Sequence, residues 1–311
     1  MEKKLANITG TANSETKIGT TAADVIKGLG GDDILKGGAG NDVIYGGIGN
    51  DKLYGEAGTD TLYGEDGNDY LDGGTGIAKL SGGAGNDTLI YNPTSSAIPS
   101  FGDYFINSTL DGGTGYDTLT VTNNSTMDGL ASRTTILGLD NGRSEIIFGG
   151  PRDGDDYKTV GTFGGIEELR LSGNGGADYF ADTYINGPKV IGTAKADNFF
   201  GGFGANDFNG GAGNDTLYVS GGNDKLNGGT GADGFVVDYT ADGKTTISGF
   251  EGAGVAGGDK FHFERYILND PAKQMTYVGG NTIFNLSDGD VDMSIVVLGV
   301  KVAMGDIAFL G

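Results

Sequence analysis

One apolar position in every nine recurs along two stretches of the chain, with glycine and aspartate at fixed places between. From residue 19 to residue 90 the sequence divides without a gap into eight nonapeptides, of which GGAGNDVIY, GGIGNDKLY and GEDGNDYLD are typical. The first position is Gly in all eight, the fourth is Gly in seven, the sixth is Asp in seven, and the eighth is always aliphatic. Agreement at four columns indicates a repeat architecture.

A second block of five nonapeptides follows from residue 192 to residue 236, with Phe or Leu at the eighth position. Two isolated copies, GGTGYDTLT at 112–120 and GNGGADYFA at 173–181, lie between the blocks. The rest of 91–191 departs from the repeat, but TLTVT, TTILGL, EIIF and IEELRLS are rich in the residue types that favour strands. We therefore expect a strand-rich segment that interrupts the two blocks.

Each nonapeptide predicts a short strand at positions seven to nine and a turn at the first six. Strand side chains alternate between faces, so only the eighth position points inward, and glycine permits the tight turn. A strand of three residues is not stable alone, whereas stacked turns bury a continuous apolar ladder. Two repeats then form one coil, and repeats n and n+2 stack on the same edge. The sequence thus predicts an all-β protein, a parallel β-roll (a β-solenoid).

The aspartates of the first block form two rows on this geometry. Successive carboxylates in a row would lie about 4.8 Å apart, where like charges repel unless a cation lies between them. Backbone carbonyls of the glycine-rich turns would face the same groove, and carboxylate plus carbonyl oxygen without His or Cys is the ligand set of Ca²⁺. Asp also favours turns for local reasons, but that does not explain a fixed sixth position. One row carries Asp24, Asp42, Asp60 and then Ala78, and the other carries Asp33, Asp51, Asp69 and Asp87.

The residues expected to hold calcium are thus sixth-position aspartates and fourth-position glycines. About ten ions would fit and would offset most of the acidic charge. The aspartates are Asp24, Asp33, Asp42, Asp51, Asp60, Asp69, Asp87, Asp117, Asp178, Asp197, Asp215, Asp224 and Asp233. The glycines are Gly31, Gly40, Gly49, Gly58, Gly67, Gly85, Gly213, Gly222 and Gly231.

One repeat of the first block, GGTGIAKLS at 73–81, has Ala78 where its neighbours have Asp. It keeps Gly73, Gly76 and Leu80, so we expect its turn and its core contact to survive. Only the carboxylate is lost. The step from Asp60 to Ala78 should therefore be a weak or empty calcium position, and that row should be one ion shorter than the other.

Composition narrows the classes of function. The 311 residues include 63 Gly, no Cys, and a net charge of −22. Disulfides and Cys-ligated metals are therefore excluded. The negative net charge also argues against binding to nucleic acid or to anionic lipid, both of which attract basic surfaces. No apolar run is long enough to span a membrane, and the first residues do not have the pattern of a cleaved secretory signal. The acidic balance suits a chain that binds cations.

Catalytic patterns are scarce. The single His262 excludes an HExxH zinc site, and its alternation with Phe261 and Phe263 places it on the outer face of a strand. There is no GxSxG elbow, and no carboxylate pair of a glycosidase can be singled out among 42 acidic residues. Tyr45 and Tyr63, two repeats apart, should stack on the outer face, where such pairs shield a sheet more often than they bind sugars. We expect no enzyme activity.

The repeats GGAGNDVIY, GGIGNDKLY and GGAGNDTLY resemble the RTX nonapeptide of haemolysin-type calcium-binding proteins. The segment from GGTGADGFVVDY to GGDKFHF resembles the last β-roll turns of serralysin-type proteases, with Asp238, Ile247, Phe250 and Asp259 at the matching positions. The resemblance implies that Asp238 and Asp259 also bind calcium. It further implies export by a type I secretion system through an uncleaved C-terminal signal.

The expected organisation is a lead-in at 1–18, a first roll block at 19–90, an inserted segment at 91–191, a second block at 192–263 and a C-terminal cap with the secretion signal at 264–311. The expected function is that of a secreted, extracellular calcium-binding protein whose roll folds as Ca²⁺ binds, with a structural, surface-layer, adhesive or host-interaction role. Its partners would be calcium ions and the type I secretion machinery, and a glycan or cell-surface partner stays open. Neither nucleic acid nor a membrane span is expected. The alternative is a secreted polysaccharide-active enzyme, or its accessory module, that uses 91–191.

Overall fold

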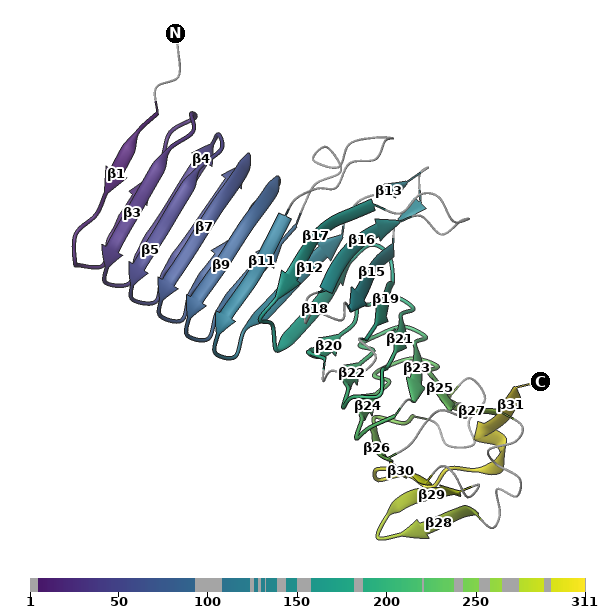
Figure 1. Cartoon of the computed structure of the whole chain (residues 1–311). Helices are drawn as coiled ribbons and strands as arrows, with labels where there is room; N and C mark the ends of the chain where they lie inside the picture. Colours follow the sequence, from purple (N-terminus) through teal and green to yellow (C-terminus); the bar gives the residue numbers. More distant parts are fainter. Residues whose placement is uncertain are drawn as a thin grey trace. The chain divides into compact units, whose positions relative to one another are not determined.

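The structure is a computed structural model of the whole chain (Figure 1). It describes residues 5–92, 108–123, 126–127, 130–131, 133–138, 144–149, 158–181, 187–219, 221–237, 243–251, 258–264, 274–287 and 292–310. The chain forms two compact units. One consists of Met1–Thr134 with Arg143–Gly175, and the other of Thr135–Gly142 with Gly176–Gly311.

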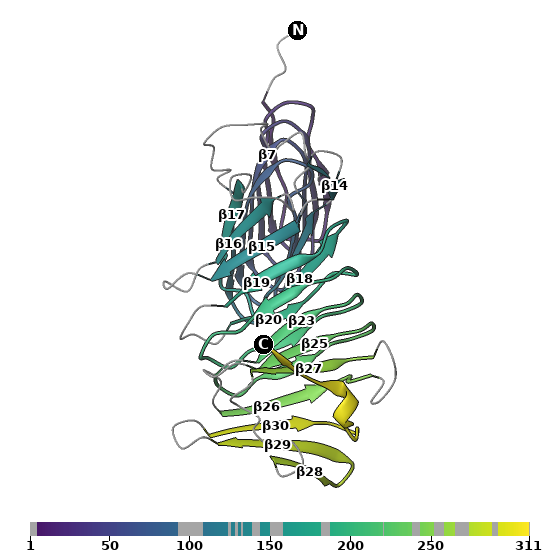
Figure 2. The same ribbon diagram turned by 90° about the vertical axis from the view of Figure 1, so that its right-hand side faces the viewer.

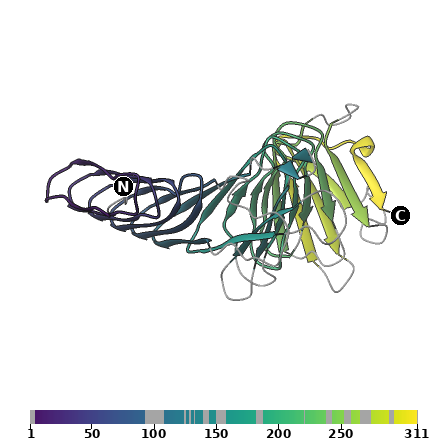
Figure 3. The ribbon, with the colours of Figure 1, turned by 90° about the horizontal axis from the view of Figure 1, so that it is seen from above.

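The first unit is a roll of two sheets of mainly parallel strands, and Figure 3 shows its N-terminal coils as successive loops. One sheet has, in order, β1 (Asn7–Thr9), β3 (Val25–Gly30), β5 (Val43–Ile48), β7 (Thr59–Asp66), β9 (Ile77–Ala84), β11 (Ser108–Thr114), β17 (Lys158–Gly164) and the antiparallel β16 (Ser144–Gly149). The other has β2 (Thr16–Ile18), β4 (Ile34–Ala39), β6 (Lys52–Ala57), β8 (Tyr70–Asp72), β10 (Thr88–Tyr91), β12 (Thr118–Asn123) and β18 (Glu168–Gly173). A short hairpin joins β13 (Thr126–Met127) to β14 (Leu130–Ala131).

Repeats n and n+2 stack as predicted. Ile26 of β3 pairs with Ile44 of β5, and Leu35 of β4 pairs with Leu53 of β6. These eighth-position side chains are fully buried in the apolar ladder. Burial of each contributes about 1.5–3 kcal/mol to folding, so the ladder holds the two sheets together. The predicted parallel β-roll is confirmed.

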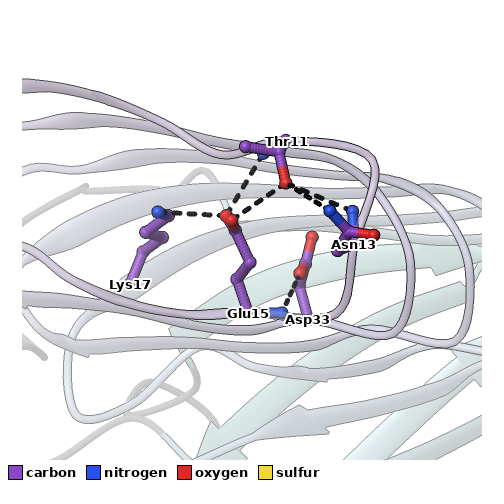
Figure 4. A network of polar contacts seen from close by, with 5 residues as sticks. All are labelled: Thr11, Asn13, Glu15, Lys17 and Asp33. Atoms are coloured by element: carbon purple, nitrogen blue, oxygen red, sulfur yellow. Dashed lines mark hydrogen bonds and ion pairs between the residues drawn. The ribbon is translucent and has the colours of Figure 1, made fainter.

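The first residues already belong to the roll. Ile8 of β1 pairs with Ile26, and Lys17 of β2 pairs with Leu35, so Lys17 takes the place of the apolar eighth residue. Its Nζ lies 3.0 Å from Oε2 of Glu15, and the hydroxyl of Thr11 donates a hydrogen bond to the other carboxylate oxygen, Oε1 (Figure 4). A polar terminal coil of this kind covers the apolar end of a stacked repeat array.

The strands predicted between the blocks are confirmed at β12, β15 (Arg133–Gly138), β16 and β18. Two of them extend the apolar ladder, because Leu119 of β12 pairs with Leu89 on one side and with Leu169 of β18 on the other. Part of the interrupting segment therefore continues the sheets of the first block.

The second unit repeats the two-sheet architecture (Figure 2). Its core is more aromatic, with Phe199, Phe208 and Phe235 fully buried. One sheet contains β19 (Ala177–Phe180), β21 (Asn198–Phe200), β23 (Thr216–Val219), β25 (Gly234–Val237), β27 (Lys260–Glu264) and β31 (Ile307–Leu310). The other contains β20 (Lys189–Ile191), β22 (Asp207–Asn209), β24 (Lys225–Asn227), β26 (Gly243–Ser248), β30 (Asp292–Val297), β29 (Asn281–Ser287) and β28 (Met275–Val278), the last two in antiparallel pairing. His262 lies between the buried Phe261 and Phe263 of β27 and is itself only partly buried, which agrees with its predicted outer face.

The predicted register is wrong at Asp178. Strand β19 pairs Asp178 with Asn198 and Tyr179 with Phe199, so Ala177 occupies the sixth position and Asp178 the seventh. Tyr179 is buried with its ring against that of Phe208, whereas the next residue faces outward. Two successive aromatic residues leave the register ambiguous in sequence, and a slip of one residue exchanges the two faces.

Candidate metal centre

The sixth-position aspartates form buried, hydrogen-bonded rows. In one row the backbone N–H of Asp24 donates to Oδ1 of Asp42 at 2.7 Å, and that of Asp42 donates to Oδ1 of Asp60 at 2.8 Å. The second row follows the same rule, with Asp51 donating to Asp69 at 2.7 Å and Asp69 to Asp87 at 2.8 Å. One carboxylate oxygen of each residue is thus fixed by the neighbouring coil.

The other carboxylate oxygen has no hydrogen-bond partner in most of these residues. An ionised oxygen that is buried without a partner is costly, so it requires a proton or a cation. The aspartates whose buried Oδ2 lacks a partner are Asp33, Asp42, Asp51, Asp60, Asp69, Asp87, Asp117, Asp215 and Asp233.

The first-position glycine of each repeat makes room for this oxygen. An ideal Cβ on Gly64 would lie within 3.0 Å of both Asp69 Oδ2 and the carbonyl oxygen of Gly82 in the next coil. The same holds at Gly28, which faces Asp33 Oδ2 and the carbonyl oxygen of Gly46. Neither Gly28 nor Gly64 has a positive φ, so space rather than backbone conformation requires glycine. A carboxylate oxygen and a carbonyl oxygen thus flank one small space, which suits a hard cation.

The predicted fourth-position glycines shape the turn. Gly49 has φ of 137° and Gly67 has φ of 138°, a region that other residues rarely adopt. An ideal Cβ on Gly67 would meet the carbonyl oxygen of Gly49, one coil earlier. These glycines allow close stacking of carbonyl-bearing turns.

Asn206 shows which atoms line the turn, because this repeat has an amide at the sixth position where the others have a carboxylate. Its Nδ2 donates to the carbonyl oxygen of Gly204 at 2.8 Å and to Oδ1 of Asp224 at 3.0 Å. A positively polarised N–H₂ group is therefore surrounded by oxygen atoms. The same lining around an aspartate fits a cation.

Three predicted ligands are already satisfied by the protein. Asp24 accepts N–H groups of Ala6 and Thr20, one at each oxygen. Asp197 accepts the N–H of Thr193 at Oδ2 and that of Ala177 at Oδ1, and Asp259 accepts those of Asp233 and Glu251. The repeats that contain Asp24 and Asp197 also lack the fourth-position glycine. These three carboxylates show no unmet need for a cation. Asp238 lies outside the described residues.

Burial raises the pKa of most of these carboxylates, including that of Asp259, which rises to about 6 although both of its oxygens accept N–H groups. Burial, with the neighbouring carboxylates adding to it, raises the pKa of Asp60, Asp69 and Asp215 to about 7 each. At Asp24 burial acts in the same direction, but the N–H groups of Ala6 and Thr20 outweigh it, and the pKa lies below its usual value. The rows thus hold carboxylates that resist ionisation unless a cation compensates them.

The coil of Ala78 departs from the others. Strands β7 and β9 pair through Asp60 and Ala78, and the N–H of Ala78 donates to the hydroxyl of Ser108 at 3.3 Å. An ideal Cβ on Gly73 would meet the methyl group of Ala78 instead of an oxygen. The core contact survives, because Leu80 is buried. The fourth-position glycine, Gly76, lacks the positive φ of its counterparts, but an ideal Cβ there would meet the carbonyl oxygen of Gly58, one coil earlier, as in the other turns.

A second ladder was missed in the sequence. The N–H of Asn68 donates to Oδ1 of Asn50 at 2.8 Å, and the N–H of Asn86 donates to Oδ1 of Asn68 at 2.7 Å. These fifth-position bonds run in the opposite direction to the aspartate bonds. The recurrent Asn before Asp, as in GND, was the available signal.

Comparison with known proteins was decisive for the repeats. A family model of the RTX calcium-binding nonapeptide repeat, in four copies, matches residues 18–53, 45–78, 79–91, 190–217 and 200–235. The two blocks are RTX repeats. RTX repeats bind calcium, and the oxygen-lined turns of the two blocks lie within the matched residues.

Among solved structures, the crystal structure of the extracellular lipase LipA from Serratia marcescens is similar at 16% sequence identity. The match covers 93% of this chain and 45% of the lipase, with a TM-score of 0.25. At that score the superposition supports no argument about activity. No curated protein matches the chain.

Two further observations concern the described residues. No helix among them is long and apolar enough to cross a membrane. No group of three or more acidic or histidine side chains that could hold a metal ion is found within those ranges.

Proposed function

We propose that this chain is a secreted protein whose β-roll folds as calcium binds outside the cell. The single observation that supports the proposal is the set of buried Oδ2 atoms without partners in the aspartate rows. At six of them in the RTX blocks a carbonyl oxygen of the next coil flanks the same space, so Ca²⁺ would supply the missing counter-charge; these are Asp33, Asp42, Asp51, Asp69, Asp87 and Asp215. Asp33, Asp42, Asp51, Asp60, Asp69, Asp87, Asp215 and Asp233 would hold the ions in the RTX blocks.

Linkage explains why location matters. A cation that binds the folded chain alone stabilises it by an amount that grows with its concentration. Extracellular calcium modules have dissociation constants of about 10⁻⁴–10⁻³ M, well above cytosolic calcium levels. The chain would remain unfolded during export, for which we propose the type I route, and would fold outside.

The test is a calcium titration of the whole chain, monitored by far-UV circular dichroism. We expect little β signal in chelator and a cooperative rise with calcium, but none with equal concentrations of Mg²⁺. An equally folded chain in chelator would overturn the proposal.

We further propose a structural or adhesive role rather than catalysis. The rings of Tyr45 and Tyr63 stack at 5.0 Å with an interplanar angle of 13°, and Lys27 lies over Tyr45. One face of each ring therefore packs on the other ring, and Lys27 also lies over Tyr45, which supports the predicted shielding of the sheet more than a sugar platform. Turnover of polysaccharides by purified chain, abolished by one carboxylate substitution in 91–191, would establish the enzymatic alternative instead.

A further inference from the structure

A turn beyond the matched RTX repeats has the features of a cation site. Asp117 is fully buried, and its Oδ2 has no hydrogen-bond partner. Its Oδ1 accepts the N–H of Asp87 at 2.7 Å, so Asp117 continues the aspartate row of Asp69 and Asp87. The family match ends at residue 91 in this part of the chain.

The facing carbonyl comes from a segment that is not a repeat. An ideal Cβ on Gly112 would lie within 3.0 Å of both Asp117 Oδ2 and the carbonyl oxygen of Gly165. In the regular coils the first-position glycine of repeat n+2, one coil further on, supplies that oxygen, as Gly82 does for Asp69. Gly165 has φ of 60°, which turns the backbone sharply at this point.

Glu167 fastens the same turn to the row. The N–H of Asp117 donates to Oε2 of Glu167 at 2.8 Å, and the carbonyl oxygen of Asp117 accepts the N–H of Glu167 at 3.1 Å. One residue separates Gly165 from Glu167, whereas four separate the first and sixth positions of a repeat. The longer side chain of Glu spans the difference, so the nonapeptide pattern includes Asp117 but does not include Gly165 or Glu167.

We infer that Asp117, the Gly165 carbonyl and Glu167 form a calcium site that fastens the turn at 165–167 to the end of the aspartate row. Two carboxylates and a carbonyl oxygen are ligands that Ca²⁺ prefers. The inference rests on the proposed function, because it extends a calcium row. One ion would thus link Asp117 to the turn at 165–167, where the chain returns to the roll after the segment between β12 and β18.

The test counts calcium ions on the whole chain by native mass spectrometry or equilibrium dialysis. We expect Asp117→Asn to bind one ion fewer than the wild type, and Glu167→Gln, which keeps the acceptor for the Asp117 N–H, to bind this ion about tenfold more weakly. Asp69→Asn is the matched control and should also lose one ion. If Asp69→Asn loses an ion and Asp117→Asn does not, this inference fails alone. If the wild type binds no calcium, the proposed function fails.

A second measurement applies if Asp117→Asn does not fold, as judged by circular dichroism in calcium. Anomalous diffraction from wild-type crystals grown in calcium should show a peak between the Asp117 carboxylate and the Gly165 carbonyl. Peaks along the RTX rows with none at this turn would overturn the inference.

Discussion

Replacing Asp69 by Asn should change the stability of the roll in opposite directions with and without calcium. The pKa of Asp69 is raised from 3.8 to about 7, chiefly by burial. At about 1.4 kcal/mol per pKa unit, holding this carboxylate ionised costs about 4 kcal/mol, and solvent screening at the turn reduces the cost to about 2 kcal/mol. Asn removes the charge, keeps the acceptor for the Asp51 N–H, and directs an amide donor toward the Gly82 carbonyl.

Extrapolated to zero calcium, the free energy of unfolding of the variant should therefore be about 2 kcal/mol higher than that of the wild type at pH 8. With calcium, the wild type gains RT ln(1 + [Ca²⁺]/Kd) from this site and the variant does not. The two effects balance near 30 times Kd, which is about 3 mM for a Kd of 10⁻⁴ M. Above that concentration the wild type should be the more stable chain.

The assay is urea unfolding at a series of calcium concentrations, with Asp24→Asn as the matched control. Both oxygens of Asp24 accept backbone N–H groups, so an amide there opposes donor to donor. The control should lose about 1–3 kcal/mol at every calcium concentration. If the free energy of unfolding of Asp69→Asn stays below that of the wild type at every calcium concentration, as expected for Asp24→Asn, the distinction between the two kinds of carboxylate is refuted.

Further predictions follow from the same coils. In chelator, the β signal in far-UV circular dichroism should be largest near pH 4 and fall as pH rises toward 7, because the raised pKa of Asp60 and Asp215 means that the folded chain binds more protons than the unfolded chain. A β signal that does not change with pH would contradict this. Glu65→Gly should stabilise the calcium-bound roll by about 1 kcal/mol, because Glu65 has φ of 77°, while Glu251→Gly serves as a control in thermal unfolding. Leu53→Ala should cost about 2–5 kcal/mol, since Leu53 is fully buried, and a loss below 1 kcal/mol would show that the ladder is not the core. Asn68→Ala should cost about 1 kcal/mol in the same assay, through loss of the acceptor for Asn86.

Periodicity predicted the roll, its register in the first block and the aspartate rows, because one rule repeats at every coil. It did not separate Asp24 from Asp42, since the difference lies in a backbone N–H of Thr20 that reaches one carboxylate and not the other. It failed at Asp178, where Tyr179 and Phe180 compete for one inward position. It also missed Gly165 and Glu167. Their contacts with the aspartate row are like those of a repeat, but their spacing in the sequence is not that of the nonapeptide.

The aspartate ladder also bears on how fast the roll can fold. Its hydrogen bonds join residues 18 apart throughout the first block, so each step closes a short loop whatever the length of the chain. Folding rates depend strongly on this separation, and a calcium jump should start a rapid, stepwise closure from coil to coil. The separation then rises to 30 between Asp87 and Asp117 and to 50 between Asp117 and Glu167. Loop entropy makes the last closure only about 1 kcal/mol costlier than a regular coil, so longer segments could be accommodated at this point without stopping the roll.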